Sequence, residues 1–292
     1  MTSRRLCQLS AALLAALTWW VCVSRPGVLG DEFVAGIIGM FGFLTLLLFG
    51  VMFLALRGAT GGSVRYWTMG APDQVRPIGW MILATSAAIV GGYVLLAAFD
   101  ATEPLWLTVA YLLTSVLVPA AFLVSGRVRW PARTRRPDGL STILAVVAAL
   151  GLVAAWTWRI SSLPSDGFDP PSTATVLFVF PATIVGSSME ELVFRVLLLT
   201  ALLDRLGSRL EAVFLSGVAF GLMHVPGELI QPVVDLDWGF FKAVVHDYAP
   251  KFLVQVWLGL FLGVLWLRTG SIILISAVHT LLNLAVDFAV GL

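Results

Sequence analysis

The chain has 292 residues, of which 59% are hydrophobic and only 12% are charged, and its mean hydropathy is +0.95. Soluble domains carry about a quarter of their residues as charged groups, so this composition excludes an ordinary soluble protein. It predicts an all-α, polytopic integral membrane protein, and the formal net charge of +1 gives no field that would favour nucleic acid as a partner.

Apolar segments recur along almost the whole chain, most of them long enough to cross a bilayer as a helix. We place them near residues 6–24, 33–56, 78–99, 105–125, 140–160, 172–203, 210–226, 252–268 and 271–290. The segments at 210–226 and 252–268 are the weakest as full spans, so we expect eight or nine transmembrane helices. Cys7 and Cys22 both lie in the first segment and fit neither a disulfide framework nor a metal motif.

Basic residues gather at alternate ends of these segments. They are Arg4, Arg5, Arg57, Arg65, Arg76, Arg127, Arg129, Arg133, Arg135, Arg136, Arg205, Arg209 and Arg268. Because basic loops remain in the cytoplasm, we expect a plasma-membrane protein with a cytoplasmic N-terminus and a cytoplasmic stretch at 126–139. The longest loop, at about 227–251, is then external and has room for an interfacial helix, and we expect Pro226 and Gly227 to end the helix that precedes it.

Small residues occur at helical spacing in two of the last segments. Gly217 and Gly221 lie four residues apart, and so do Gly259 and Gly263. In lipid such positions allow two helix backbones to approach closely, so this pattern predicts helix packing.

The most informative residues are three charged groups within the apolar segment at 172–203. Glu190 and Glu191 are adjacent, and Arg195 follows four residues after Glu191. An ionisable group at membrane depth costs about 2.5 to 3.5 kcal/mol even on lenient insertion scales. Residues four apart share a helix face, so Glu191 and Arg195 can form an ion pair, either structural or catalytic.

Two further polar clusters follow, Phe220-x-x-x-His224 and His279-x-x-x-Asn283. A helix rises ~1.5 Å per residue, so Glu190, His224 and Asn283 each lie roughly 20 Å from the expected cytoplasmic end of their helix. His279 is about one turn shallower. Three separate helices are therefore predicted to present polar groups at a common depth.

These residue types together suit hydrolysis. A carboxylate beside a neutral imidazole can take a proton from water and so generate a nucleophile. A second imidazole and an amide can donate hydrogen bonds to the oxyanion of a tetrahedral intermediate. A base, a water site and an oxyanion hole are thus available for cleaving an amide bond without a serine or cysteine nucleophile.

The three motifs, Glu-Glu-x-x-x-Arg, Phe-x-x-x-His and His-x-x-x-Asn, resemble those of the CPBP family in order and setting. This family takes in CAAX prenyl endopeptidases of the Rce1 type and bacteriocin-processing or immunity proteins, also called the Abi family. The resemblance covers roughly residues 172–290. It divides the chain into residues 1–140, membrane helices without an assigned role, and residues 141–292, which carry the catalytic core.

The resemblance implies roles for six residues. Glu190 would be the general base and would hold the water together with His224, while His279 and Asn283 would form the oxyanion hole. Glu191 and Arg195 would act as an orienting pair. We favour a mechanism without a cofactor, but Glu190, His224 and His279 could also serve as three ligands of a zinc ion with an open fourth position.

The sequence thus predicts an intramembrane endopeptidase for membrane-associated, CAAX-like peptide or protein substrates, with membrane lipid around it. One alternative is a non-enzymatic immunity or accessory membrane protein. A second alternative is a proton-coupled transporter, because intramembrane carboxylates also suit a proton relay. Inverted repeats, which are common in transporters, are not evident in the sequence.

Overall fold

The helices of the C-terminal two thirds of the chain follow the apolar segments closely. The structure is a computed structural model that describes residues 66–71, 73–99, 104–134, 139–161, 173–234 and 238–289, with Leu9, Ala12, Leu13 and Ala16. The expected spans near 6–24 and 33–56, with Cys7 and Cys22, fall outside the continuous described ranges.

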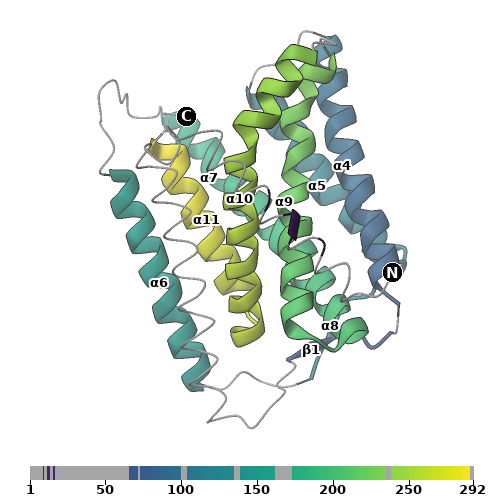
Figure 1. The fold of residues 1–292 in the computed structure, drawn as a ribbon, viewed down its shortest axis with the longest axis vertical. Coiled ribbons are helices and arrows are strands. Elements are labelled where there is room, and N and C mark those ends of the chain that lie inside the picture. Colours follow the sequence, from purple (N-terminus) through teal and green to yellow (C-terminus); the bar gives the residue numbers. More distant parts are fainter. Residues whose placement is uncertain are drawn as a thin grey trace.

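The described helices run roughly along one common axis (Figure 1). Their bounds are α4 Val75–Ala98, α5 Pro104–Val124, α6 Gly139–Ser161, α7 Thr173–Glu191, α8 Thr200–Leu206, α9 Arg209–Val234, α10 Trp238–Thr269 and α11 Ile272–Ala289. A π-helix, η1, occupies Leu192–Leu199 and joins α7 to α8 without a break.

Four helical stretches in the described part of the chain are long and apolar enough to cross a membrane. They are Val75–Ala98, Leu105–Val124, Leu177–Leu206 and Phe252–Thr269, and shorter apolar helices cover Thr142–Ala154 and Ile272–Ala285. Several such helices in one chain are the pattern of a multi-pass helical membrane protein.

The expected helix end at Pro226 and Gly227 is wrong, and the region at about 227–251 is mostly helical. Helix α9 continues past Pro226 and Gly227 to Val234, and α10 already begins at Trp238. Proline removes one backbone donor, but membrane helices tolerate it where neighbouring helices and local adjustments satisfy the freed carbonyl. Pro226 therefore does not end α9, although a proline at this place would be expected to end a helix in a soluble protein.

Among the described residues, the all-helical expectation has one small exception, at the end of the bundle where α8 lies (Figure 1). Strand β1, Trp67–Thr68, pairs antiparallel with β2, Ala132–Arg133. Asp204 beside them accepts hydrogen bonds from the Thr68 hydroxyl at 2.8 Å and from the Met69 amide at 2.7 Å. The segments gathered here belong to the loops that the arginine pattern places on one side of the membrane.

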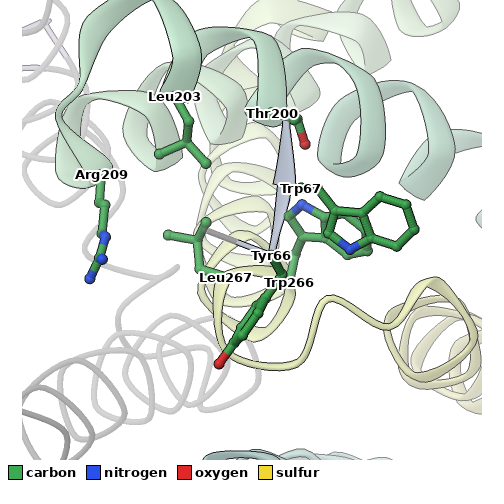
Figure 2. Close-up of a pocket in the computed structure, with 7 residues that line it drawn as sticks. All are labelled: Tyr66, Trp67, Thr200, Leu203, Arg209, Trp266 and Leu267. Carbon is green, nitrogen blue, oxygen red and sulfur yellow. The ribbon is translucent and has the colours of Figure 1, made fainter. Parts of the chain in front are cut away.

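The same end of the bundle holds a small pocket (Figure 2). Its lining residues are Tyr66, Trp67, Thr200, Leu203, Arg209, Trp266 and Leu267. Trp67 stacks on Trp266 with ring centroids 5.7 Å apart, and its indole nitrogen donates to the Gly270 carbonyl at 3.1 Å. None of the charged residues of α7 lines this pocket, so it belongs to the packing of the bundle end.

Helices α9 and α10 approach each other through the predicted glycines. A Cβ atom on Gly259 would lie 2.9 Å from the Cα of Gly217, and one on Gly221 would lie 2.5 Å from a methyl group of Val256. Such distances are shorter than side-chain contacts allow, so only glycine fits at these positions. The prediction of close packing from glycine spacing is confirmed. It holds α9, which carries His224, against the centre of the bundle.

Candidate active site

Glu190 and Glu191 are the last two residues of α7, directly before η1. The Glu191 side chain is fully buried, and that of Glu190 is almost so. Every residue of η1 is buried as well, so the acidic pair lies at the most enclosed part of the long α7–η1–α8 helix. The π-helix replaces i→i+4 hydrogen bonds by i→i+5 bonds, a change often found at functional sites.

Two histidines from different helices face the same oxygen of Glu190. The Nε2 atom of His224, on α9, lies 3.7 Å from Glu190 Oε2, and the Nε2 atom of His279, on α11, lies 3.8 Å from it. Glu190 Oε2 has no hydrogen-bond partner among the described residues. Both separations exceed a direct hydrogen bond but suit a bridging water molecule.

Glu191 connects His279 to Arg195. Its Oε1 atom lies 2.9 Å from His279 Nδ1, and its Oε2 atom lies 3.2 Å from Arg195 Nε. All three side chains are almost completely buried. Buried charges are tolerated in a low-dielectric interior only when they are paired, and this ion pair meets that condition. The pairing of Glu191 with Arg195 expected from their spacing is therefore present.

Phe220 lies at the centre of this polar cluster. Its ring meets those of His224 and His279 edge-on, with centroids 4.7 and 5.7 Å apart. The guanidinium carbon of Arg195 lies 4.2 Å from the Phe220 ring centroid, a cation–π contact. The first residue of the Phe-x-x-x-His motif thus packs against both imidazoles and the buried cation, which sets their relative positions.

Asn283 approaches α7 through a residue that the sequence analysis missed. Its side-chain Nδ2 donates to the hydroxyl of Ser187 at 3.2 Å, and Ser187 lies one turn before Glu191 on α7. An asparagine amide has two N–H hydrogens, so one is engaged by Ser187 and the second remains for another acceptor.

A second missed residue comes from α5. The hydroxyl of Tyr111 donates a hydrogen bond to Glu190 Oε1, the oxygen that does not face the histidines. The only signal for it in the sequence is a tyrosine inside an otherwise apolar segment, and such a hydroxyl has many conceivable partners. The structure therefore brings together Glu190, Glu191, Arg195, His224 and His279 as predicted, joins Asn283 to α7 through Ser187, and adds Tyr111.

The hydrogen bonds decide which imidazole nitrogen carries hydrogen. His224 Nδ1 lies 2.9 Å from the backbone carbonyl of Phe220, which can only accept, so Nδ1 must donate. His279 Nδ1 faces the ion-paired carboxylate of Glu191 and donates in the same way. In their neutral forms both histidines therefore direct an Nε2 lone pair towards Glu190 Oε2. The Nε2 atoms of the two histidines and Glu190 Oε2 are then three hydrogen-bond acceptors around one position. This arrangement suits a water molecule that donates to two of them.

The same three atoms were expected to be the ligands if the site held zinc. Each histidine has its other ring nitrogen fixed by a carbonyl or a carboxylate, as metal-ligating histidines usually do. Within the described ranges, however, no group of three or more His, Cys, Asp or Glu residues has an arrangement that could hold a metal ion. The donor set is that of zinc, whereas its present spacing is wider than a coordinated ion requires.

A comparison with known protein families finds a match for the region that contains these residues. Residues 172–285 match the model of the family described as type II CAAX prenyl endopeptidase, Rce1-like. This region is similar to Rce1-like CAAX prenyl endopeptidase domains. The expected CPBP resemblance is confirmed over these residues, which include Glu190, Glu191, Arg195, His224, His279 and Asn283. No curated protein and no solved structure matches the chain.

The matched region covers less than half of the chain and begins just before α7. It therefore includes α7 to α11 and excludes α4, α5 and α6. A domain of this family implies a hydrolase that acts on a peptide. Tyr111, which contacts Glu190, belongs to the part of the chain that the family comparison does not reach.

Proposed function

We propose that this protein is an intramembrane endopeptidase that hydrolyses a peptide bond of a membrane-associated substrate with water activated by Glu190. The observation that carries the proposal is the convergence of Glu190 Oε2 with the Nε2 atoms of His224 and His279, at 3.7 and 3.8 Å. At these distances one water molecule can lie between the three atoms. It is then close enough to the Glu190 carboxylate to give up a proton as it attacks the substrate.

In the proposed first step, the water oxygen attacks the carbonyl carbon of the scissile bond. Glu190 Oε2 takes one proton from that water, and His224 accepts a hydrogen bond from it and so orients it. Positioned general bases of this kind contribute about 10²–10⁴-fold to the rate. The product of this step is a tetrahedral intermediate with a negative oxygen, and Glu190 is neutral.

The negative oxygen is stabilised by Asn283 and His279. Asn283 has one N–H beyond the one that Ser187 accepts. For His279 Nε2 to donate as well, His279 must carry hydrogen on both nitrogens, and the carboxylate of Glu191 at 2.9 Å stabilises that cation. With Glu190 protonated, the Glu191 carboxylate and the oxyanion balance the Arg195 guanidinium and the His279 imidazolium, so the buried cluster carries no net charge.

In the second step, the C–N bond breaks and Glu190 returns its proton to the leaving amine. This restores the carboxylate and releases a new C-terminal carboxyl group and a new N-terminal amine. Glu191 and Arg195 do not exchange protons with the substrate and instead hold His279 in place. The mechanism uses no covalent intermediate between enzyme and substrate.

The most accessible side chain of this site is that of His224, on α9. The His224 side chain is 25% exposed, whereas those of Glu190 and His279 are 10% and 2% exposed. We therefore propose that substrate enters past His224. We also propose eight or nine spans in the plasma membrane, with the N-terminus in the cytoplasm, on the basis of the arginine pattern.

The proposed substrate class is a CAAX-like prenylated peptide, because the matched family is described by that activity. Purified protein in liposomes should cleave a prenylated CAAX peptide, and faster than the same peptide without the lipid. If the prenylated and unprenylated peptides were cleaved at equal rates, the protein would be an endopeptidase that does not recognise the lipid. If neither peptide nor a general protein substrate is cleaved, a non-enzymatic immunity or accessory role replaces the proposal.

A further inference from the structure

Tyr111 contacts the proposed base from outside the catalytic domain. It lies on α5, which packs against both α4 and α7, and its hydroxyl donates to Glu190 Oε1. Its ring lies against Gly186, one turn before Glu190, where an added Cβ would be 3.4 Å from a ring carbon. The small residue at position 186 thus leaves the space in which the tyrosine ring reaches the carboxylate.

This hydrogen bond makes the two oxygens of Glu190 inequivalent. Oε1 is engaged by Tyr111, whereas Oε2 has no hydrogen-bond partner in the described part of the chain and faces His224 and His279. A glutamate with a free carboxylate can rotate about its terminal bond and exchange the two oxygens. Tyr111 opposes that rotation and so keeps one particular oxygen directed at the water site.

The backbone carbonyl of Tyr111 accepts hydrogen bonds within its own helix. The hydroxyl of Ser115 donates to the Tyr111 carbonyl at 2.5 Å, and that of Thr114 donates to it at 3.0 Å. Groups that position a catalytic side chain act by keeping it within a narrow range of the reactive geometry. A tyrosine on a helix that is tightly packed against α7 meets this requirement.

We propose that Tyr111 is a positioning residue for Glu190, so that the membrane helices before residue 172 complete the active site of the Rce1-like domain. The inference rests on the proposed function of Glu190 as the general base. It gives residues outside the family match a part in the reaction: they hold the base so that Oε2 alone receives the proton from water.

The test is the Tyr111→Phe variant in the full-length protein, with Tyr93→Phe on the adjacent helix α4 as the matched control. Phenylalanine keeps the ring that packs on Gly186 and removes only the hydroxyl, so the variant should still fold, with a thermal melt lowered only by the lost hydrogen bond. Loss of the hydrogen bond that positions the base should lower kcat about 10- to 100-fold, with KM nearly unchanged. Tyr93→Phe should keep wild-type kcat.

A double-mutant cycle provides a readout that does not depend on proteolysis. Thermal unfolding of Tyr111→Phe, Glu190→Ala and the double variant should show coupling between the two positions, and Tyr93→Phe with Glu190→Ala should show none. Coupling with an unchanged kcat in Tyr111→Phe would make Tyr111 a purely structural contact and overturn the inference. A rise in KM alone would overturn it too. A wild-type protein without any peptidase activity would instead refute the proposed function and leave the coupling measurable.

Discussion

His279 Nδ1 lies 2.9 Å from Glu191 Oε1, although the two residues are 88 positions apart and belong to helices α11 and α7. This contact joins the two motifs that the sequence places at opposite ends of the catalytic domain. It also determines that His279 directs Nε2 at Glu190, and it places Glu191 between His279 and Arg195. The proposed roles of the adjacent glutamates follow from this contact. Glu191 orients His279, and Glu190 takes the proton from water.

The first prediction concerns the ion pair on which that orientation depends. Arg195→Met should lower the free energy of unfolding by about 3–5 kcal/mol, because it leaves Glu191 buried without its cation. The matched control is Arg205→Met, which removes the exposed ion pair with Asp73 at 3.2 Å. An exposed pair contributes about 0–1 kcal/mol, so the control should unfold almost like the wild type. If the two variants lowered the melting temperature equally, Arg195 would not be the cation that stabilises buried Glu191.

The second prediction concerns the oxyanion. Asn283→Ala should lower kcat about 10²–10³-fold with KM nearly unchanged, because the lost N–H acts only on the tetrahedral intermediate. Ser187→Ala should have a smaller effect, since it frees the Asn283 amide without removing it. Steady-state kinetics on one peptide substrate measures both variants. A change in KM alone would show that Asn283 binds substrate or packs the helices.

The third prediction concerns the contact between α9 and α10. Gly259→Ala should destabilise the protein by about 1–3 kcal/mol, because the new methyl group would overlap the Gly217 backbone. Gly151→Ala, on α6, is the control, since nothing lies within 4 Å of a Cβ there. It should be neutral or slightly stabilising, as alanine is the better helix former. If both variants melt alike, the close approach of α9 and α10 is not what holds His224 in position.

The fourth prediction concerns orientation and is independent of the family. Single cysteines at Gly139 and Gly239, in a Cys7→Ser, Cys22→Ser background, should differ in labelling by an impermeant maleimide applied to intact cells. Only the cysteine at position 239 should react, because basic residues keep 126–139 in the cytoplasm. Labelling at position 139 alone would reverse the orientation. Labelling at both positions would mean that one span is miscounted.

The fifth prediction concerns metal. Exhaustive chelation should leave the cleavage rate unchanged, since the proposed steps use only side chains of the protein and water. Elemental analysis of the purified protein checks the same point and should find no stoichiometric zinc. Loss of activity on chelation, restored by added zinc, would make Glu190, His224 and His279 metal ligands instead.

The parts of the structure that could be predicted from the sequence are those with a strong local signal. Long apolar runs predicted the positions of α4 to α7, α11 and the C-terminal part of α10. Polar groups expected at a similar depth on three helices, together with the family resemblance, predicted the meeting of Glu190, His224 and His279. Glycine spacing predicted the contact of α9 with α10. These signals work because lipid makes an unpaired charge or a gap in a helix costly.

The parts that could not be predicted have no such local signal. Residues Leu192–Leu199 read as an ordinary apolar helix, and a change from i→i+4 to i→i+5 bonding leaves no trace in composition. Pro226 predicted a helix end, but neighbouring helices override that tendency in a membrane protein. The partners of Tyr111 and Ser187 depend on which helices pack side by side, and that is a property of the tertiary structure.

The most direct test of the central claim is the rate of peptide cleavage by Glu190→Gln in liposomes, measured beside its thermal melt. Glutamine keeps the size of the side chain and can still accept the Tyr111 hydrogen bond, but it cannot take a proton from water. The variant should melt close to the wild type and cleave about 10²–10⁴-fold more slowly. A folded Glu190→Gln variant that cleaves at the wild-type rate would contradict the assignment of Glu190 as the base.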